Sequence, residues 1–102
     1  MKRRIAISPE VASQILSASS YFEGIQEGLS LEFERETEAV FESIASHPNM
    51  YPKEFGIIRR ALIRRFHKVV FYTVREEVIV VLEFRDARQA PPDWESRGYR
   101  RS

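Results

Sequence analysis

Residues 56–85 read GIIRRALIRRFHKVVFYTVREEVIVVLEFR and carry the strongest signal for β-strands in the chain. Valine, isoleucine, phenylalanine and tyrosine dominate it, as they dominate the half-buried positions of β-sheets. We therefore predict three strands, over residues 56–65, 66–74 and 77–85. The polar residues 75–77 are the only break between the last two strands, so these two are predicted to form a hairpin.

Two amphipathic helices are predicted before these strands. The first begins at Pro9 with Ser8 as its N-cap, because proline suits the first helical position. Its apolar stripe comprises Val11, Ala12, Ile15, Leu16, Ser19 and Phe22. The second runs from about Leu29 to His47, where the following prolines end it. Its buried face is predicted to comprise Phe33, Thr37, Val40, Phe41 and Ile44.

A short strand over residues 3–8 precedes the helices, which gives the order β-α-α-β-β-β. Two helices joined by a short connection pack as an antiparallel hairpin, and one face of the sheet must cover their apolar stripes. The chain of 102 residues is long enough for one such core. We predict a single two-layer α+β domain over residues 1–102, in which the hairpin packs on a small, mainly antiparallel sheet. Its body covers about 3–86 and its basic C-terminal tail about 87–102.

Side-chain alternation divides the arginine pairs of the first predicted strand, provided that it continues regularly to Phe66. Ile58, Leu62 and Phe66 then share the more apolar face, which we predict to pack against the helices. The open face carries Arg59 and Arg65, where they are free to contact a partner.

Composition and charge restrict the kind of protein. The chain has no cysteine, so disulfides and cysteine-ligated zinc are excluded. Its basic start is followed by too few apolar residues for a signal peptide, and VIVVL is too short to cross a bilayer. We therefore expect a cytoplasmic protein without a membrane partner. Residues 1–52 carry four basic and eight acidic side chains, whereas residues 53–102 carry twelve basic and seven acidic ones, which suggests two surfaces with different partners.

Sequence motifs for chemistry are sparse. His47 and His67 have no neighbours at metal-ligand spacing, so neither a metal site nor a cofactor is expected. His47 fits a helix C-terminus. His67 is either a polar residue at a strand end or a general base for attack of an RNA 2′-hydroxyl on phosphate. The tail interleaves arginines with Trp94 and Tyr99, a pattern that suits either contact with nucleic acid or anchoring of the tail to the body.

Two patterns in the second half are similar to those of a known toxin family. Many members of this family have two arginines followed by a phenylalanine and a later tyrosine. The matching residues here are Arg64, Arg65, Phe66 and Tyr72. A closing pattern is matched at the same spacing by Arg88, Pro91, Trp94 and Arg97. With these, the chain resembles over nearly its whole length the ParE/RelE superfamily of toxins from bacterial type II toxin–antitoxin modules. Within it, the resemblance is to the ParE-like, plasmid-stabilisation branch.

The chain also departs from this family. His67 replaces the proline after the phenylalanine, and Asp86, Gln89 and Ala90 replace the histidine, second arginine and aspartate of the closing pattern. RelE-type members that cut messenger RNA usually carry an arginine where Val69 stands, and an acid–base tyrosine near the position of Trp94. Because an indole cannot transfer that proton, cleavage chemistry loses a factor of roughly 100 to 10,000.

The resemblance therefore implies a toxin that inhibits DNA gyrase by binding and has no catalytic residue of its own. A cognate antitoxin with a disordered segment that folds on binding would neutralise it in a toxin–antitoxin hetero-oligomer. The residues assigned to target binding are Arg59, Arg65, Arg85, Arg88, Trp94 and Arg97. Those assigned to antitoxin binding are Phe22, Phe33, Phe41, Tyr51 and Tyr72.

Two alternatives stay open at this point. The first is a ribosome-dependent, RelE-like messenger-RNA interferase, an endoribonuclease that would use Arg65, His67, Arg85 and Arg88. The second is a protein with the toxin fold that binds an antitoxin-like partner and is not toxic.

Overall fold

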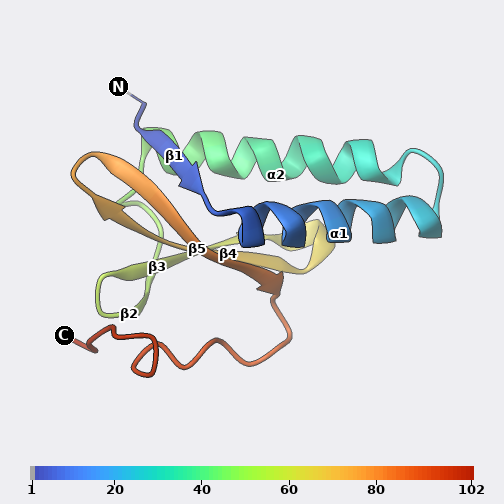
Figure 1. Cartoon of the computed structure of the whole chain (residues 1–102). Coiled ribbons are helices and arrows are strands. Elements are labelled where there is room, and N and C mark those ends of the chain that lie inside the picture. The colour runs from blue at the N-terminus through green and yellow to red at the C-terminus, as the bar shows by residue number, and fades with distance from the viewer. Residues whose placement is uncertain (1) are drawn as a thin grey trace.

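The computed structural model describes residues 2–102 and consists of a helical hairpin packed on a five-stranded mixed sheet (Figure 1). Its elements are β1 (Arg4–Ile7), α1 (Pro9–Ile25), α2 (Leu29–Ser46), β2 (Lys53–Phe55), β3 (Ile58–Ile63), the 3₁₀ turn η1 (Arg64–Phe66), β4 (Lys68–Arg75) and β5 (Val78–Asp86). The predicted α+β class is confirmed. Within residues 2–102, no helix is long and apolar enough to cross a membrane.

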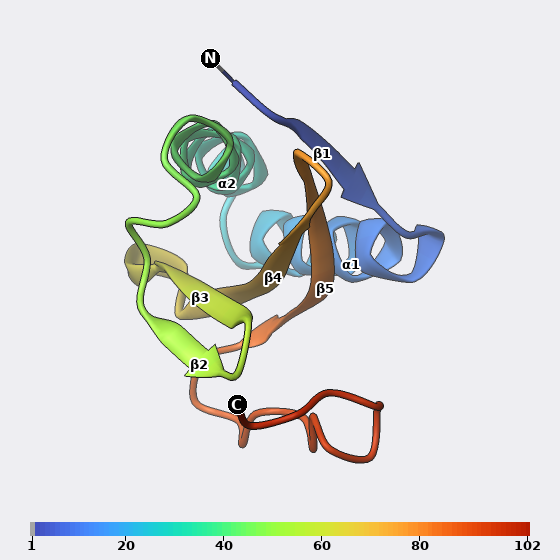
Figure 2. The ribbon, with the colours of Figure 1, turned by 90° about the vertical axis from the view of Figure 1, so that its left-hand side faces the viewer.

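The strands lie in the order β1-β5-β4-β3-β2. β1 runs parallel to β5, while the other neighbouring strands are antiparallel. The predicted β4–β5 hairpin is present, and its turn places Glu76 and Glu77 at positive φ. The sequence did not predict β2, a three-residue edge strand. Both helices lie on one side of the sheet (Figure 2).

The helix ends follow local rules. Ser8 Oγ accepts a hydrogen bond from the backbone N–H of Val11 at 3.1 Å, which confirms the predicted N-cap. At the other end of α1, the Glu23 carboxylate accepts hydrogen bonds from the backbone N–H groups of Gly28 and Ser30 and from the Ser30 hydroxyl. These bonds lower the pKa of Glu23 and fix the turn between the helices.

The main core lies between the hairpin and the sheet. Four aromatic rings form its centre: Phe22 from α1, Phe33 from α2, Phe66 from η1 and Phe84 from β5. The Phe33 and Phe66 centroids are 5.3 Å apart in an edge-to-face arrangement, which is favourable for aromatic pairs. Of the predicted α2 face, Phe33, Thr37 and Ile44 are buried, and Val40 and Phe41 pack against the core as half-buried residues.

Tyr72 anchors the loop after α2 to this core. Its side chain is fully buried, and its hydroxyl donates a hydrogen bond to the backbone carbonyl of Pro48. Burial raises the pKa of Tyr72 to about 12, because the phenolate would lose its hydration.

This shift predicts a loss of stability in alkali. The folded state binds the Tyr72 proton more tightly than the unfolded state. The protonated side chain therefore makes its full contribution to the free energy of unfolding below pH 10, and this contribution is lost as the pH rises through about 12. Between pH 9 and 11.5 we expect Tyr72→Phe to lose about 2 kcal/mol less unfolding free energy than the wild type. Urea unfolding at both pH values measures the difference. Equal losses of unfolding free energy in the two proteins would show that folding does not raise the pKa of Tyr72.

The prediction for the face of β3 is wrong. β3 ends at Ile63, because η1 and a left-handed His67 (φ 54°) turn the chain into β4. Ala61 and Ile63 face the helices, whereas Ile58 packs in a second core on the opposite face. Phe66 does reach the main core, but from the turn and not from a strand.

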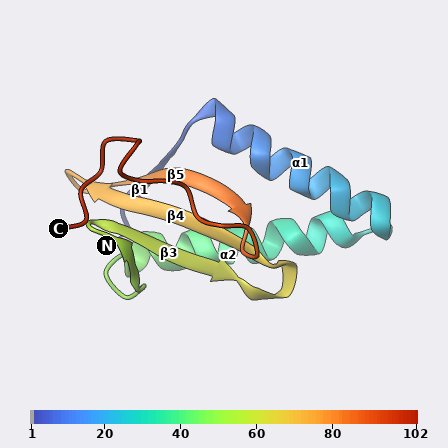
Figure 3. The same cartoon turned by 90° about the horizontal axis from the view of Figure 1, so that it is seen from below.

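The reason is that both faces of the sheet are covered. Alternation identifies a core face only when the other face meets water. Here residues 87–102 run across the face opposite the helices (Figure 3). Four buried residues form the second core there, namely Ile58, Val69, Phe71 and Trp94.

Trp94 holds the tail in place. Only 3% of Trp94 is exposed, and its ring lies 5.2 Å from that of Phe71 and 6.0 Å from that of Tyr99. Further along, the tail backbone passes so close to the β2–β3 turn that a Cβ on Gly56 would collide with the carbonyl of Arg100. Anchoring is therefore the structural role of Trp94, and the tail is a packed part of the domain.

Candidate functional site

A bulge in β5 determines which charged residues meet the tail. The pairing shifts between Tyr72↔Val81 and Phe71↔Glu83, so Leu82 is an extra residue on β5. Without the bulge, Glu83 would continue on the helix side after Val81. With it, Glu83 lies on the tail side and Phe84 enters the main core.

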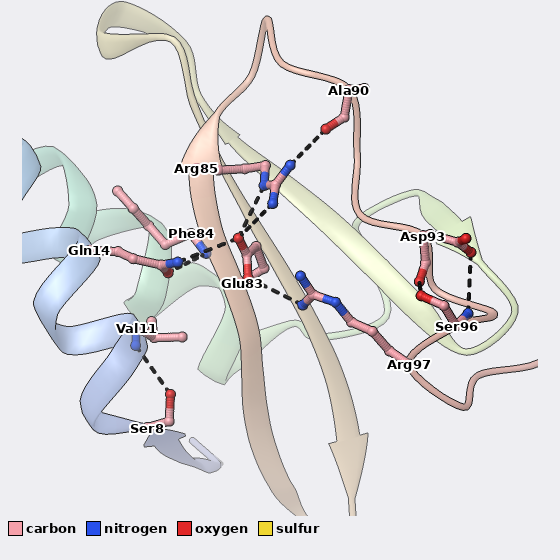
Figure 4. A network of polar contacts seen from close by, with 10 residues as sticks. All are labelled: Ser8, Val11, Gln14, Glu83, Phe84, Arg85, Ala90, Asp93, Ser96 and Arg97. Carbon is pink, nitrogen blue, oxygen red and sulfur yellow. Dashed lines mark hydrogen bonds and ion pairs between the residues drawn. The ribbon is translucent and has the colours of Figure 1, made fainter.

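The Glu83 carboxylate is the centre of a polar network that joins β5, α1 and the tail (Figure 4). Arg85 donates to Oε2 of Glu83 from Nε at 3.1 Å and from Nη2 at 3.0 Å. Arg97 donates to Oε1 at 3.3 Å, and Gln14 donates to Oε2 at 3.4 Å. Since Glu83 is only 8% exposed, these donors replace the water that its charge requires.

Gln14 is placed by the end of β1. The register of β1 with β5 stops at Val81, so within residues 2–102 no strand pairs with this edge of β5 beyond Val81. There the side-chain carbonyl of Gln14 accepts the backbone N–H of Phe84 at 3.2 Å. One amide therefore closes the sheet edge and contacts Glu83 at the same time.

The network also fastens the tail. Arg85 donates from Nη1 to the carbonyl of Ala90 at 2.8 Å, and the Arg97 guanidinium lies 5.3 Å from the centre of the Trp94 ring. Both oxygens of Glu83 and both guanidinium groups are engaged in these contacts. These contacts hold the tail against the sheet.

A second cluster lines a cavity of about 370 Å³ between the end of α1, η1 and the end of β5. The structure brings three of the four residues of the nuclease alternative to this cavity, namely Arg65, His67 and Arg88. Arg85 lies outside it, on a neighbouring cavity that shares Lys68 and Asp86 with it.

The arginines of this cavity carry carboxylate partners from the same chain. Arg88 binds Asp86 with two side-chain contacts, at 3.0 and 2.7 Å, and holds the pKa of Asp86 well below its usual range. Arg65 contacts Glu32 at 2.8 Å and Glu36 at 3.2 Å. A phosphate entering the cavity would have to compete with these acids, which disfavours transition-state stabilisation by these arginines.

The other residues predicted to bind a target are placed unevenly. Arg59 is half-buried on the helix side of the sheet, where it donates to the carbonyl of Tyr51 at 2.6 Å, so its predicted position on the open face is wrong. Trp94 is buried, so its ring is not available to stack on a partner. The side chain of Arg88 is 70% exposed, which makes it more accessible than those of Arg65, Arg85 and Arg97.

The residues assigned to antitoxin binding belong to the core. Phe33 and Tyr72 are 0% exposed, and Phe22, Phe41 and Tyr51 are half-buried against the main core. The accessible large apolar side chains are others, namely Ile7, Leu16, Tyr21, Ile25, Leu31, Met50, Ile57 and Leu62. Leu16 and Ala12, both on the predicted apolar stripe of α1, are exposed to solvent.

Sequence reasoning missed Glu83, Gln14 and Lys68. The signal for Glu83 was present, because a single acid within VIVVLEF must be buried and therefore needs partners. Nothing local identified Gln14 or Lys68. Within residues 2–102, no group of three or more histidine, cysteine or acidic side chains is positioned to hold a metal ion.

Comparison with known proteins does not place the chain in a family. No protein-family model matches it, and no curated protein matches it. The resemblance to ParE-like toxins therefore rests on the sequence patterns described above.

Proposed function

We propose that this chain is a ParE-like toxin of a type II toxin–antitoxin module, which acts on DNA gyrase by binding and not by catalysis. The observation that carries the second part of the proposal is the pairing of its arginines. Arg65, Arg85 and Arg88, which a nuclease would use on phosphate, each contact a carboxylate of the same chain. Charges neutralised in this way suit the edge of a protein interface better than a phosphodiester-cleaving site.

The tail is the surface that we assign to the target. Trp94 and the Glu83 network hold residues 87–102 against the sheet, so the tail presents its exposed arginines without further ordering. A preorganised surface loses less conformational entropy on binding than a flexible one. Arg88, Arg97, Arg100 and Arg101 are the exposed cations of this surface.

A cognate antitoxin segment would neutralise the toxin by folding on it. Because the residues first assigned to this contact are in the core, the exposed apolar residues of the hairpin are better candidates. Tyr21 and Ile25 at the end of α1 are 65% and 59% exposed, and both line the cavity that also holds Lys68. An acidic amphipathic segment matches this combination of apolar and basic side chains.

The nuclease alternative retains one supporting observation. Arg65, His67 and Arg88 do line one cavity, although Arg88 lies more than twenty residues after the other two. In that reading, His67 would be the proton acceptor, and Arg65 and Arg88 would leave their carboxylates to bind phosphate.

Induced expression in bacteria tests the proposal. We expect growth inhibition with filamentous cells and a DNA-damage response, relieved by co-expression of a small protein encoded beside the gene. We expect Arg88→Ala to require about ten times the protein level of the wild type for the same growth inhibition, because the loss of an interface arginine commonly weakens binding by this much. Arg35→Ala, an exposed arginine on α2, is the matched control.

The outcomes separate the three readings. Rapid translation arrest with cut transcripts would favour the messenger-RNA interferase. Normal growth, while a partner protein still binds, would favour the non-toxic protein. Equal inhibition by wild type and Arg88→Ala at equal protein levels would exclude Arg88 from the active surface.

A further inference from the structure

A cavity of about 230 Å³ lies away from the tail, where the loop after α2 meets β2 and the ends of β3 and β4. Its lining residues are Asn49, Lys53, Ile57, Arg59, Tyr72, Thr73 and Val74. The lining includes two cations and no acid. This cavity is smaller than a site for a drug-sized ligand, which typically measures roughly 300 Å³ or more.

The two cations face each other across the sheet edge. Lys53 is the register partner of Arg59 in the β2–β3 pair, so their side chains leave the sheet on the same face. Like charges directly opposite each other in an antiparallel pair are destabilising. The sheet therefore carries a repulsion here that an anion between the two side chains would relieve.

No acidic side chain within residues 2–102 forms an ion pair that would relieve the repulsion between Lys53 and Arg59. Across residues 2–102, nine ion pairs join acidic and basic side chains within 4.0 Å, and none of them includes Lys53 or Arg59. This contrasts with Arg65, Arg85 and Arg88, which all have carboxylate partners. The charge of this cavity is therefore available to a ligand.

One contact orients the guanidinium of Arg59. Arg59 is half-buried, and its Nη1 donates to the Tyr51 carbonyl at 2.6 Å, which holds the guanidinium in place. Its other N–H groups make no hydrogen bond within residues 2–102 and can donate to a ligand. The Tyr72 hydroxyl donates to the Pro48 carbonyl, which fixes the loop beside Asn49 against the sheet.

We propose that this cavity binds a phosphoryl dianion, as inorganic phosphate or as a phosphomonoester, through Lys53, Arg59 and Asn49. Two cations match the charge of a dianion, and the ammonium, guanidinium and amide supply donors from three side chains. A planar carboxylate would use fewer of them. The site does not depend on the proposed toxin function, because it involves neither the tail nor the hairpin cavity.

Backbone amide NMR of the whole chain tests the site. Inorganic phosphate and glycerol 2-phosphate are titrated separately at constant ionic strength set with chloride. We expect saturable shifts at Lys53, Arg59 and Thr73, and roughly tenfold weaker binding in Lys53→Gln, because a charge-assisted hydrogen bond is lost. Saturation by phosphate alone would identify the free anion as the ligand, and saturation by both would identify a phosphomonoester site.

Arg35→Gln is the matched control, because it removes one exposed charge on α2 and should leave the affinity unchanged. Arg59→Lys, which keeps the charge but loses the guanidinium fork, should also weaken binding. Shifts centred on Lys68 and Arg88, equal weakening in Arg35→Gln and Lys53→Gln, or no saturation at the three residues would overturn the proposal.

Discussion

Trp94→Ala is expected to lower the free energy of unfolding by about 3–5 kcal/mol and to release the tail from the sheet. Trp94 is the largest member of the second core, and it contributes the only buried side chain of residues 87–102. Its removal exposes Ile58, Val69 and Phe71 to water and leaves a cavity that these residues cannot fill. Urea unfolding followed by circular dichroism measures the loss of stability.

Hydrogen exchange distinguishes release of the tail from unfolding of the whole domain. We expect faster exchange in residues 94–99 of Trp94→Ala, where the backbone N–H groups of Arg97 and Tyr99 bond the Trp94 carbonyl, and much less change in α1 and α2. Leu16→Ala is the control, because Leu16 is exposed and makes little difference to a core. A change of less than ~1 kcal/mol in Trp94→Ala would mean that the tail does not contribute to stability.

This result affects any toxicity assay of the tail. If Trp94→Ala abolishes growth inhibition, the loss reflects a displaced tail and not a missing contact between the indole and the target. Trp94→Phe, which keeps an aromatic ring in the second core, should retain more of the inhibition. Arg88, which is exposed, is the more informative position for a direct contact.

Glu83→Gln is expected to cost about 2–3 kcal/mol of unfolding free energy. The substitution keeps the shape of the side chain but leaves Arg85 and Arg97 near the sheet without their counter-charge. Removing one partner of a fully buried ion pair typically costs roughly 3–5 kcal/mol, and we expect less because both arginines are partly exposed.

A double-mutant cycle isolates the pair. Arg97→Gln in the Glu83→Gln background should cost less than in the wild type, because the carboxylate that Arg97 binds is already absent. Glu95→Gln, which breaks the exposed pair with Arg101, is the control and should change stability little. Additive costs at positions 83 and 97 would show that the 3.3 Å contact between them has no energetic role.

The sequence predicted those parts of the fold that depend on local chemistry. Ser8 and Pro9 start α1, the helix-period stripes place Phe33 and Ile44 inside, and the β-branched segments form β4 and β5. Each of these features follows from contacts within a few residues along the chain. The α+β order followed from them, because two amphipathic helices and a sheet leave few ways to bury their apolar faces.

The site was predicted less well, because its geometry depends on contacts between distant residues. The extra residue Leu82 moves Glu83 to the tail side of the sheet, and no local sequence pattern predicts this bulge. The turn η1 ends β3 early and brings Arg65 against Glu32 and Glu36, which lie about thirty residues earlier. Arginines that looked free in the sequence are therefore paired in the structure.

By itself, the sequence of residues 56–85 determined that this chain forms a sheet, and residues 8–46 determined that two helices cover it. The face of β3 that joins the main core could be identified only in the folded structure, because the answer depends on whether another segment covers the second face. Trp94 and the tail cover it by packing on Phe71, more than twenty residues earlier in the chain. Local periodicity shows which positions along a strand are apolar enough to be buried. Which segment buries them is fixed only when the whole chain has folded.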